Sequence, residues 1–121
     1  MPISFTFTRQ HRLLTGRQFQ TVFDNKELKV VSGPFLLLVK ENQQTLPRLG
    51  LVIGRRKAKL AVDRAAIKRR AREQFRLRQQ DLQGLDMVLL LVGNVRHPDR
   101  DKLSRDMIRL FDKLLAKRGQ D

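Results

Sequence analysis

An unbroken apolar stretch constrains the fold more than any other part of this sequence. Segment 86–92 reads DMVLLLV and lacks the alternation of apolar and polar residues that marks a half-exposed strand. Such a run is expected of a central strand in a sheet. Its apolar part, 87–92, is far shorter than the run of about 20 residues that a membrane-spanning helix requires. We therefore expect a sheet built around this strand and no membrane partner.

The other elements are predicted from periodicity and from turn and cap signals. Thr15 can cap a first helix that ends near Phe23, and Asp63 can cap a long helix that ends near Gln80. Strands are expected at 28–31, 35–39 and 48–53, and a last helix at 100–117. The order α-β-β-β-α-β-α predicts a single α+β domain over residues 1–121, with helices packed on a four-stranded sheet. Residues 1–14 lack sustained periodicity and are expected to form an extended N-terminal arm.

The charge of the chain indicates the kind of partner. Lys and Arg number 26 against 12 Asp and Glu, which gives a net charge of +14 and favours a polyanionic partner. The chain has no cysteine, which excludes disulfides and cysteine-based zinc sites. His11 and His97 lie too far apart for a metal-ligand motif and are expected at the surface. Residues 1–10 lack the pattern of a signal peptide, so a cytoplasmic protein is expected.

The long helix separates its charge from its apolar side. At 100° per residue, Ile67, Ala71 and Phe75 share one face, which predicts the contact with the sheet. A separate stripe beside that face is cationic and consists of Lys68, Arg69, Arg72 and Arg76. A solvated helix more often alternates charge signs to form i, i+4 pairs. The segregation therefore favours a phosphate-binding surface over a merely solvated face.

Two further features border this helix in the sequence. A basic loop of Arg55, Arg56, Lys57 and Lys59 precedes it and is either a ligand site or a solvated loop. Phe19 and Phe23, one turn apart on the first helix, either pack in the core, which is the default for such a pair, or form a platform for unpaired bases. No metal-binding carboxylate cluster or nucleophile motif stands out, so the residues indicate a binding protein.

Three segments together resemble the bacterial ribonuclease P protein component. They are RLLTGRQFQTVF, PRLGLVIGRRKAKLAV, and DRAAIKRRAREQFRL continued by the strand DMVLLLV. The resemblance implies a left-handed βαβ crossover around the long helix and a role as the protein subunit of a ribonucleoprotein endoribonuclease. In that family the RNA subunit holds the catalytic Mg²⁺, and the protein assists removal of the 5′ leader from precursor tRNA. The implied partners are the RNA subunit and precursor tRNA, with no DNA and no metal or cofactor held by the protein.

The resemblance also assigns residues. It implies that the single-stranded leader binds in a cleft lined by Arg12, Phe19, Phe23 and Leu38. It implies that RNA is bound by the basic loop and helix through Arg55, Arg56, Arg64, Lys68, Arg69 and Arg72. The alternative from the residues alone is a general RNA-binding or ribosome-associated protein without preference for a leader.

The sequence departs from the family pattern at the start of the long helix. The family signature reads Arg-Asn-Arg, whereas this chain has Arg64, Ala65 and Ala66. The helical wheel places Ala65 within the cationic stripe and Ala66 off both principal faces. Alanine favours the helix, so we expect the departure to weaken RNA binding and leave folding intact. Restoring Asn and Arg together is expected to tighten RNA binding and steepen its salt dependence.

Overall fold

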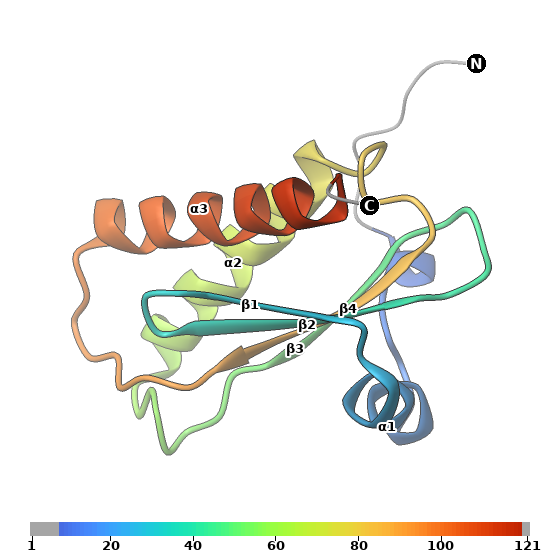
Figure 1. The fold of residues 1–121 in the computed structure, drawn as a ribbon. Helices are drawn as coiled ribbons and strands as arrows, with labels where there is room; N and C mark the ends of the chain where they lie inside the picture. Colours follow the sequence, from blue (N-terminus) through green and yellow to red (C-terminus); the bar gives the residue numbers. More distant parts are fainter. Residues whose placement is uncertain (1–7, 120–121) are drawn as a thin grey trace.

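The computed structural model describes residues 8–119, which form a four-stranded sheet with helices on both faces (Figure 1). The elements follow the predicted order, with a short 3₁₀ helix added at the start. Their bounds are η1 (Arg9–His11), α1 (Gly16–Asn25), β1 (Leu28–Ser32), β2 (Phe35–Glu41), β3 (Arg48–Val52), α2 (Ala61–Leu77), β4 (Leu85–Leu91) and α3 (Arg100–Arg118). The predicted α+β class is confirmed.

Strand β4 lies inside the sheet, as its apolar sequence predicts. The strand order is β1-β2-β4-β3, with β4 antiparallel to β2 and parallel to β3. Met87, Val88 and Leu89 have no exposed surface. The parallel pair is joined through α2 (Figure 1), and this is the connection at which the resemblance implies a left-handed crossover. Sequence periodicity could not give this hand, because nearly all such crossovers are right-handed.

The two faces of the sheet are covered by different helices. α2 and α3 cover one face, where they close the main core around Phe35, Phe75 and Phe111. α1 lies on the opposite face (Figure 1), where a smaller cluster of Leu13, Val22, Leu38 and Val88 holds it. Thr15 caps α1 as predicted, since its side chain accepts a hydrogen bond from the Gln18 amide at 3.2 Å. One face of the sheet is thus fully packed, and the other is only partly covered.

The start of α2 differs from the prediction. The helix begins at Ala61 after an N-cap residue, Leu60, whose side chain makes no capping bond. Asp63, predicted as the cap, lies in the first turn with 1% of its surface exposed. Its Oδ2 accepts a hydrogen bond from the backbone amide of His97 at 3.1 Å. The carboxylate therefore ties the β4–α3 loop to the positive end of α2, where a negative charge is stabilised.

The N-terminal segment packs against the domain where it is described. Residues 1–7 of the predicted arm lie outside the described residues, whereas η1 and the stretch after it run along the outer edge of β3. There Arg12 bridges Leu49 in parallel. His11, expected at the surface, is buried, and its ring packs edge-on against Phe75 with centroids 5.8 Å apart. No helix among residues 8–119 is long and apolar enough to cross a membrane.

Candidate nucleic-acid interface

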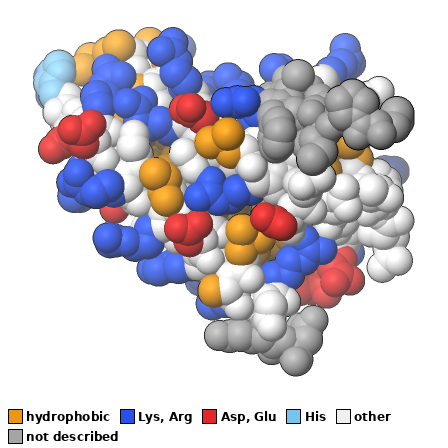
Figure 2. Space-filling model, turned by 90° about the horizontal axis from the view of Figure 1, so that it is seen from above, with side chains coloured by type: hydrophobic (Ala, Val, Ile, Leu, Met, Phe, Trp, Pro, Cys, Tyr) orange, Lys and Arg blue, Asp and Glu red, His pale blue; other side chains and the backbone are white. Residues whose placement is uncertain are grey.

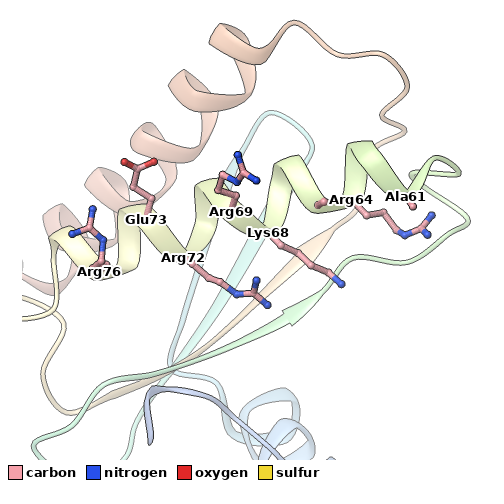
Figure 3. A pocket seen from close by; sticks show the side chains of 8 residues that line it. Ala61, Arg64, Lys68, Arg69, Arg72, Glu73 and Arg76 are labelled. Atoms are coloured by element: carbon pink, nitrogen blue, oxygen red, sulfur yellow. The ribbon is translucent and has the colours of Figure 1, made fainter. Parts of the chain in front are cut away.

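An open groove runs along the exposed side of α2. Figure 3 shows Lys68 and Arg72 extending to one side of the helix axis and Arg69 and Glu73 to the other. Glu73 is the one acidic residue of the lining. We call this surface the α2 groove, and its lining residues are Ala61, Arg64, Ala65, Lys68, Arg69, Arg72, Glu73 and Arg76. The structure thus brings together the four cations of the predicted stripe, Arg76 among them, and places Arg64 beside them.

Arg64 connects the groove to the basic loop before it. Its Nη1 donates hydrogen bonds to the carbonyl oxygens of Ala58 at 2.8 Å and Lys59 at 2.9 Å. The loop backbone is therefore fixed against α2, although sequence reasoning gave no reason for such order. Arg55 and Arg56 lie in this loop with exposed side chains. They stand beyond the end of β3, separate from the groove lining.

Arg12 and Arg72 bring positive charge from two elements to one place. Burial lowers the pKa of Arg72 from its ordinary value, and the positive charge of Arg12 lowers this pKa further. A guanidinium nevertheless stays charged at neutral pH. Two such charges held in proximity raise the local potential, which favours an anion beside them. Arg12 lies along the outer edge of β3. It thereby extends the basic surface of α2 toward the face of the sheet that carries α1.

Phe19 and Phe23 have features of both alternatives that their spacing left open, which are packing in the core and forming a platform for bases. Both rings are partly buried and pack against the small cluster under α1, in which Val22 is the fully buried anchor. The Phe19 ring lies over Gly50 of β3, so closely that a Cβ built on this glycine would lie 2.4 Å from a ring carbon. The two aromatics hold α1 to the sheet and keep part of their surface exposed.

Leu38 is more deeply buried than we expect of a residue that contacts the leader. Only 4% of its surface is exposed, because it belongs to the buried cluster beneath α1. In this arrangement Leu38 supports α1 from below, and RNA could reach it only if α1 moved. Arg12, by contrast, has an exposed side chain at the edge of the sheet.

An apolar row beside α1 was not expected from the sequence. Strand register places Val31 opposite Leu36, Leu36 opposite Leu90, and Leu90 opposite Val52. Paired residues share a face of the sheet, and Leu36 and Leu90 pack against the α1 cluster. Val31 and Val52, at the two ends of the row, are exposed. Each strand alone suggests a core residue at these positions, and only the register reveals a partly open platform.

The two alanines at the start of α2 have different environments. Ala65 is exposed and lines the groove, as the wheel predicts. Ala66, which the wheel places off both principal faces, is nevertheless buried, with 5% of its surface exposed. One turn later on this side, Arg70 donates from Nε to Ser104 Oγ of α3 at 3.0 Å. α2 is buried on two sides, against the sheet and against α3, which a wheel with one apolar face does not anticipate.

The described residues contain no group of three or more His, Cys, Asp or Glu that could hold a metal ion. The buried carboxylate of Asp86 serves another purpose. It accepts hydrogen bonds from Arg48 Nε at 2.8 Å and Nη2 at 2.6 Å, and from Asn42 Nδ2 at 2.9 Å. These bonds fasten the β2–β3 connection to β4. The interface is thus built of cations and apolar side chains.

A family model described as Ribonuclease P matches residues 7–115 of the chain. The chain belongs to this family. The ribonuclease P protein component of Alcanivorax borkumensis is 64% identical over 117 residues, which are 97% of each chain. That of Pseudomonas putida strain GB-1 is 46% identical over 100 residues, which are 80% of this chain and 75% of the relative.

Solved structures of the ribonuclease P protein share the fold. A Staphylococcus aureus ribonuclease P protein superimposes with a TM-score of 0.70 at 21% identity, covering 90% of this chain and 95% of its own. The Thermotoga maritima protein gives a TM-score of 0.66 at 24% identity, covering 84% and 96%. As a member of the family, the chain is the protein subunit of ribonuclease P, the ribonucleoprotein endoribonuclease of tRNA processing.

Proposed function

We propose that the chain binds the ribonuclease P RNA through the α2 groove and the 5′ leader of precursor tRNA through the α1 face of the sheet. The observation that carries this proposal is the gathering of five cations in the α2 groove, with a single acid among them. Arginine forks match phosphate oxygens, and each neutralised phosphate releases counterions. Such a surface suits a folded RNA with closely spaced phosphates.

The leader would lie on the opposite side of the domain. Phe19 and Phe23 offer partly exposed rings, and the row from Val31 to Val52 offers an apolar floor beside them. Bases of a single strand stack on such surfaces with little dependence on sequence. Arg12, at the edge of β3, would meet the strand's phosphates. This arrangement would let one subunit accept leaders of different sequence.

The catalytic metal would belong to the RNA. We infer that Mg²⁺ is bound by the RNA subunit, and that the protein lowers the concentration required because its cations reduce repulsion between the phosphates of enzyme and substrate. Assembly is expected in the cytoplasm. The protein's contribution is therefore binding and positioning, and bond cleavage occurs on the RNA.

Reconstitution with a bacterial ribonuclease P RNA tests the proposal. We expect the wild-type chain to lower the Mg²⁺ concentration needed for leader removal, and Lys68→Ala to weaken this effect. Arg109→Ala is the matched control, since it removes one exposed cation from α3 that is not part of the groove lining. An unchanged Mg²⁺ requirement with the wild-type chain would contradict the proposal.

A further inference from the structure

A second basic pocket lies at one end of the sheet, outside the α2 groove. It is formed by two loops, 53–60 after β3 and 92–99 after β4, which follow the carboxyl ends of two parallel strands. Its lining residues are Arg56, Lys57, Lys59, Asn94, Val95 and Arg96. Four of these six carry a positive charge. Neither Asn94 nor Arg96 was singled out by the sequence.

The two loops are held as one unit. The Val95 amide donates to the Lys57 carbonyl at 2.7 Å, and the His97 amide donates to Asp63 at 3.1 Å. The side chains of Val95 and Ala58 are buried in the main core. Because backbone bonds and core contacts fix both loops, the cations they carry are presented from a rigid base, which reduces the entropy lost on binding.

The acids nearest in sequence form no salt bridge with the cations of this pocket. Asp63 is buried and accepts from a backbone amide, and Asp99 caps α3 by accepting from the amides of residues 101 and 102. The salt bridges among residues 8–119 join Arg48 to Asp86, Arg78 to Asp112 and Lys102 to Asp106. The positive charge of the pocket is therefore left for an external anion.

The surface view supports the same conclusion. In Figure 1 both loops lie at the left end of the sheet, and the turn to Figure 2 keeps that end on the left. Figure 2 shows Lys and Arg side chains gathered toward that end of the face that it draws. The field there favours a partner with several negative charges over a single small anion.

We propose that the β4–α3 loop is a further RNA-binding element, in which Arg96 and Asn94 act with Lys57 and Lys59 to hold phosphates of the RNA backbone. The proposal rests on the proposed function and extends it by a second contact, in the loops after β3 and β4. Lysine and arginine supply charge, and the Asn94 amide supplies a neutral donor to a phosphate oxygen. The backbone could belong to the RNA subunit or to precursor tRNA, whose phosphates are chemically alike.

The test compares two double variants that remove equal charge. Lys57→Ala with Arg96→Ala removes two exposed cations from the pocket, and Arg105→Ala with Arg109→Ala removes two from the exposed side of α3. Affinity for a bacterial ribonuclease P RNA is measured over a salt series. We expect the pocket pair to lower the salt slope by about 1.4–1.8, since each phosphate contact contributes about 0.7–0.9, and the α3 pair to leave it unchanged.

A second arm repeats the series with precursor tRNA and the reconstituted complex. A loss confined to the first arm assigns the pocket to the RNA subunit, and a loss confined to the second assigns it to the substrate; either supports the proposal. Equal slopes for the pocket pair and the α3 pair in both arms overturn it. If Lys68→Ala still lowers the slope in that case, the proposed function stands alone. If Lys68→Ala has no effect either, both fail.

Discussion

Gly50→Ala perturbs the support of α1 at a single point. Gly50 is buried in β3, opposite Val88, and the Phe19 ring lies on it. The added Cβ would lie 2.4 Å from Phe19 Cε1 and 2.6 Å from Cζ, whereas ordinary contacts begin at 3.4 Å. The ring must therefore retreat by about 1 Å, because carbon atoms in contact are most stable at roughly 3.5–4.0 Å.

The cost follows from overpacking. Adding a methyl group to a packed site costs about 1–3 kcal/mol. Replacing glycine within a strand returns about 0.5–1 kcal/mol through the lower entropy of the unfolded chain. We expect a net loss of up to about 2.5 kcal/mol from the free energy of unfolding, and a weaker preference for precursor tRNA because Phe19 is displaced. The salt slope for the RNA subunit should stay unchanged, since Gly50 lies outside the α2 groove.

A double-mutant cycle with Phe19→Ala isolates the contact. Without the ring, both of the closest contacts of the Gly50→Ala methyl group are gone, and the next is the flexible end of Leu13, at 3.1 Å. The two substitutions should therefore be non-additive in urea unfolding, with a coupling of about 1 kcal/mol or more. Additive losses would refute this account of how Phe19 is held.

Three further predictions concern the helix start, a histidine and a buried ion pair. Ala66→Arg should lower the free energy of unfolding in urea by about 1–3 kcal/mol, because the site is buried. Ala65→Arg should leave this free energy unchanged and steepen the salt dependence of RNA binding by up to about 0.9. Equal behaviour of the two variants would count against the assigned burial. Burial lowers the pKa of His11, so the unfolded chain binds the proton more readily than the folded chain, and stability should fall as pH drops below about 6.5. His11→Gln should remove this part of the pH dependence of thermal unfolding. An unaltered pH profile in the variant would contradict this prediction. Arg48→Met should cost about 1.5–3 kcal/mol, the range for bonds to charged groups, because Asp86 loses two donors; a neutral result by chemical denaturation would show the pair contributes nothing.

The order of elements could be read from the sequence because each has a strong local signal. The apolar run of β4 and the Thr15 cap are local features, and the structure confirms both. Asp63 was wrongly predicted as the cap of α2, because an acid at the cap and an acid in the first turn cannot be told apart in the sequence. The difference depends on His97, which lies 34 residues away in the sequence.

The candidate site was predicted in part, for a related reason. The period of a single helix determines which of its residues share a side, so Lys68 and Arg72 could be assigned to a common side from the sequence. Contacts between elements could not be predicted this way. The burial of Ala66 depends on α3, and the apolar row depends on the register of four strands. The pocket with Arg96 requires two loops joined through a backbone bond.

The central claim is that the domain presents separate surfaces to the RNA subunit and to the leader. The most direct test is the ratio of affinities for precursor and mature tRNA in the complex reconstituted with a bacterial ribonuclease P RNA. We predict that the wild-type complex clearly prefers the precursor, and that Phe23→Ala reduces this ratio while the complex still assembles. Equal affinity of the assembled wild-type complex for both tRNAs would contradict the claim.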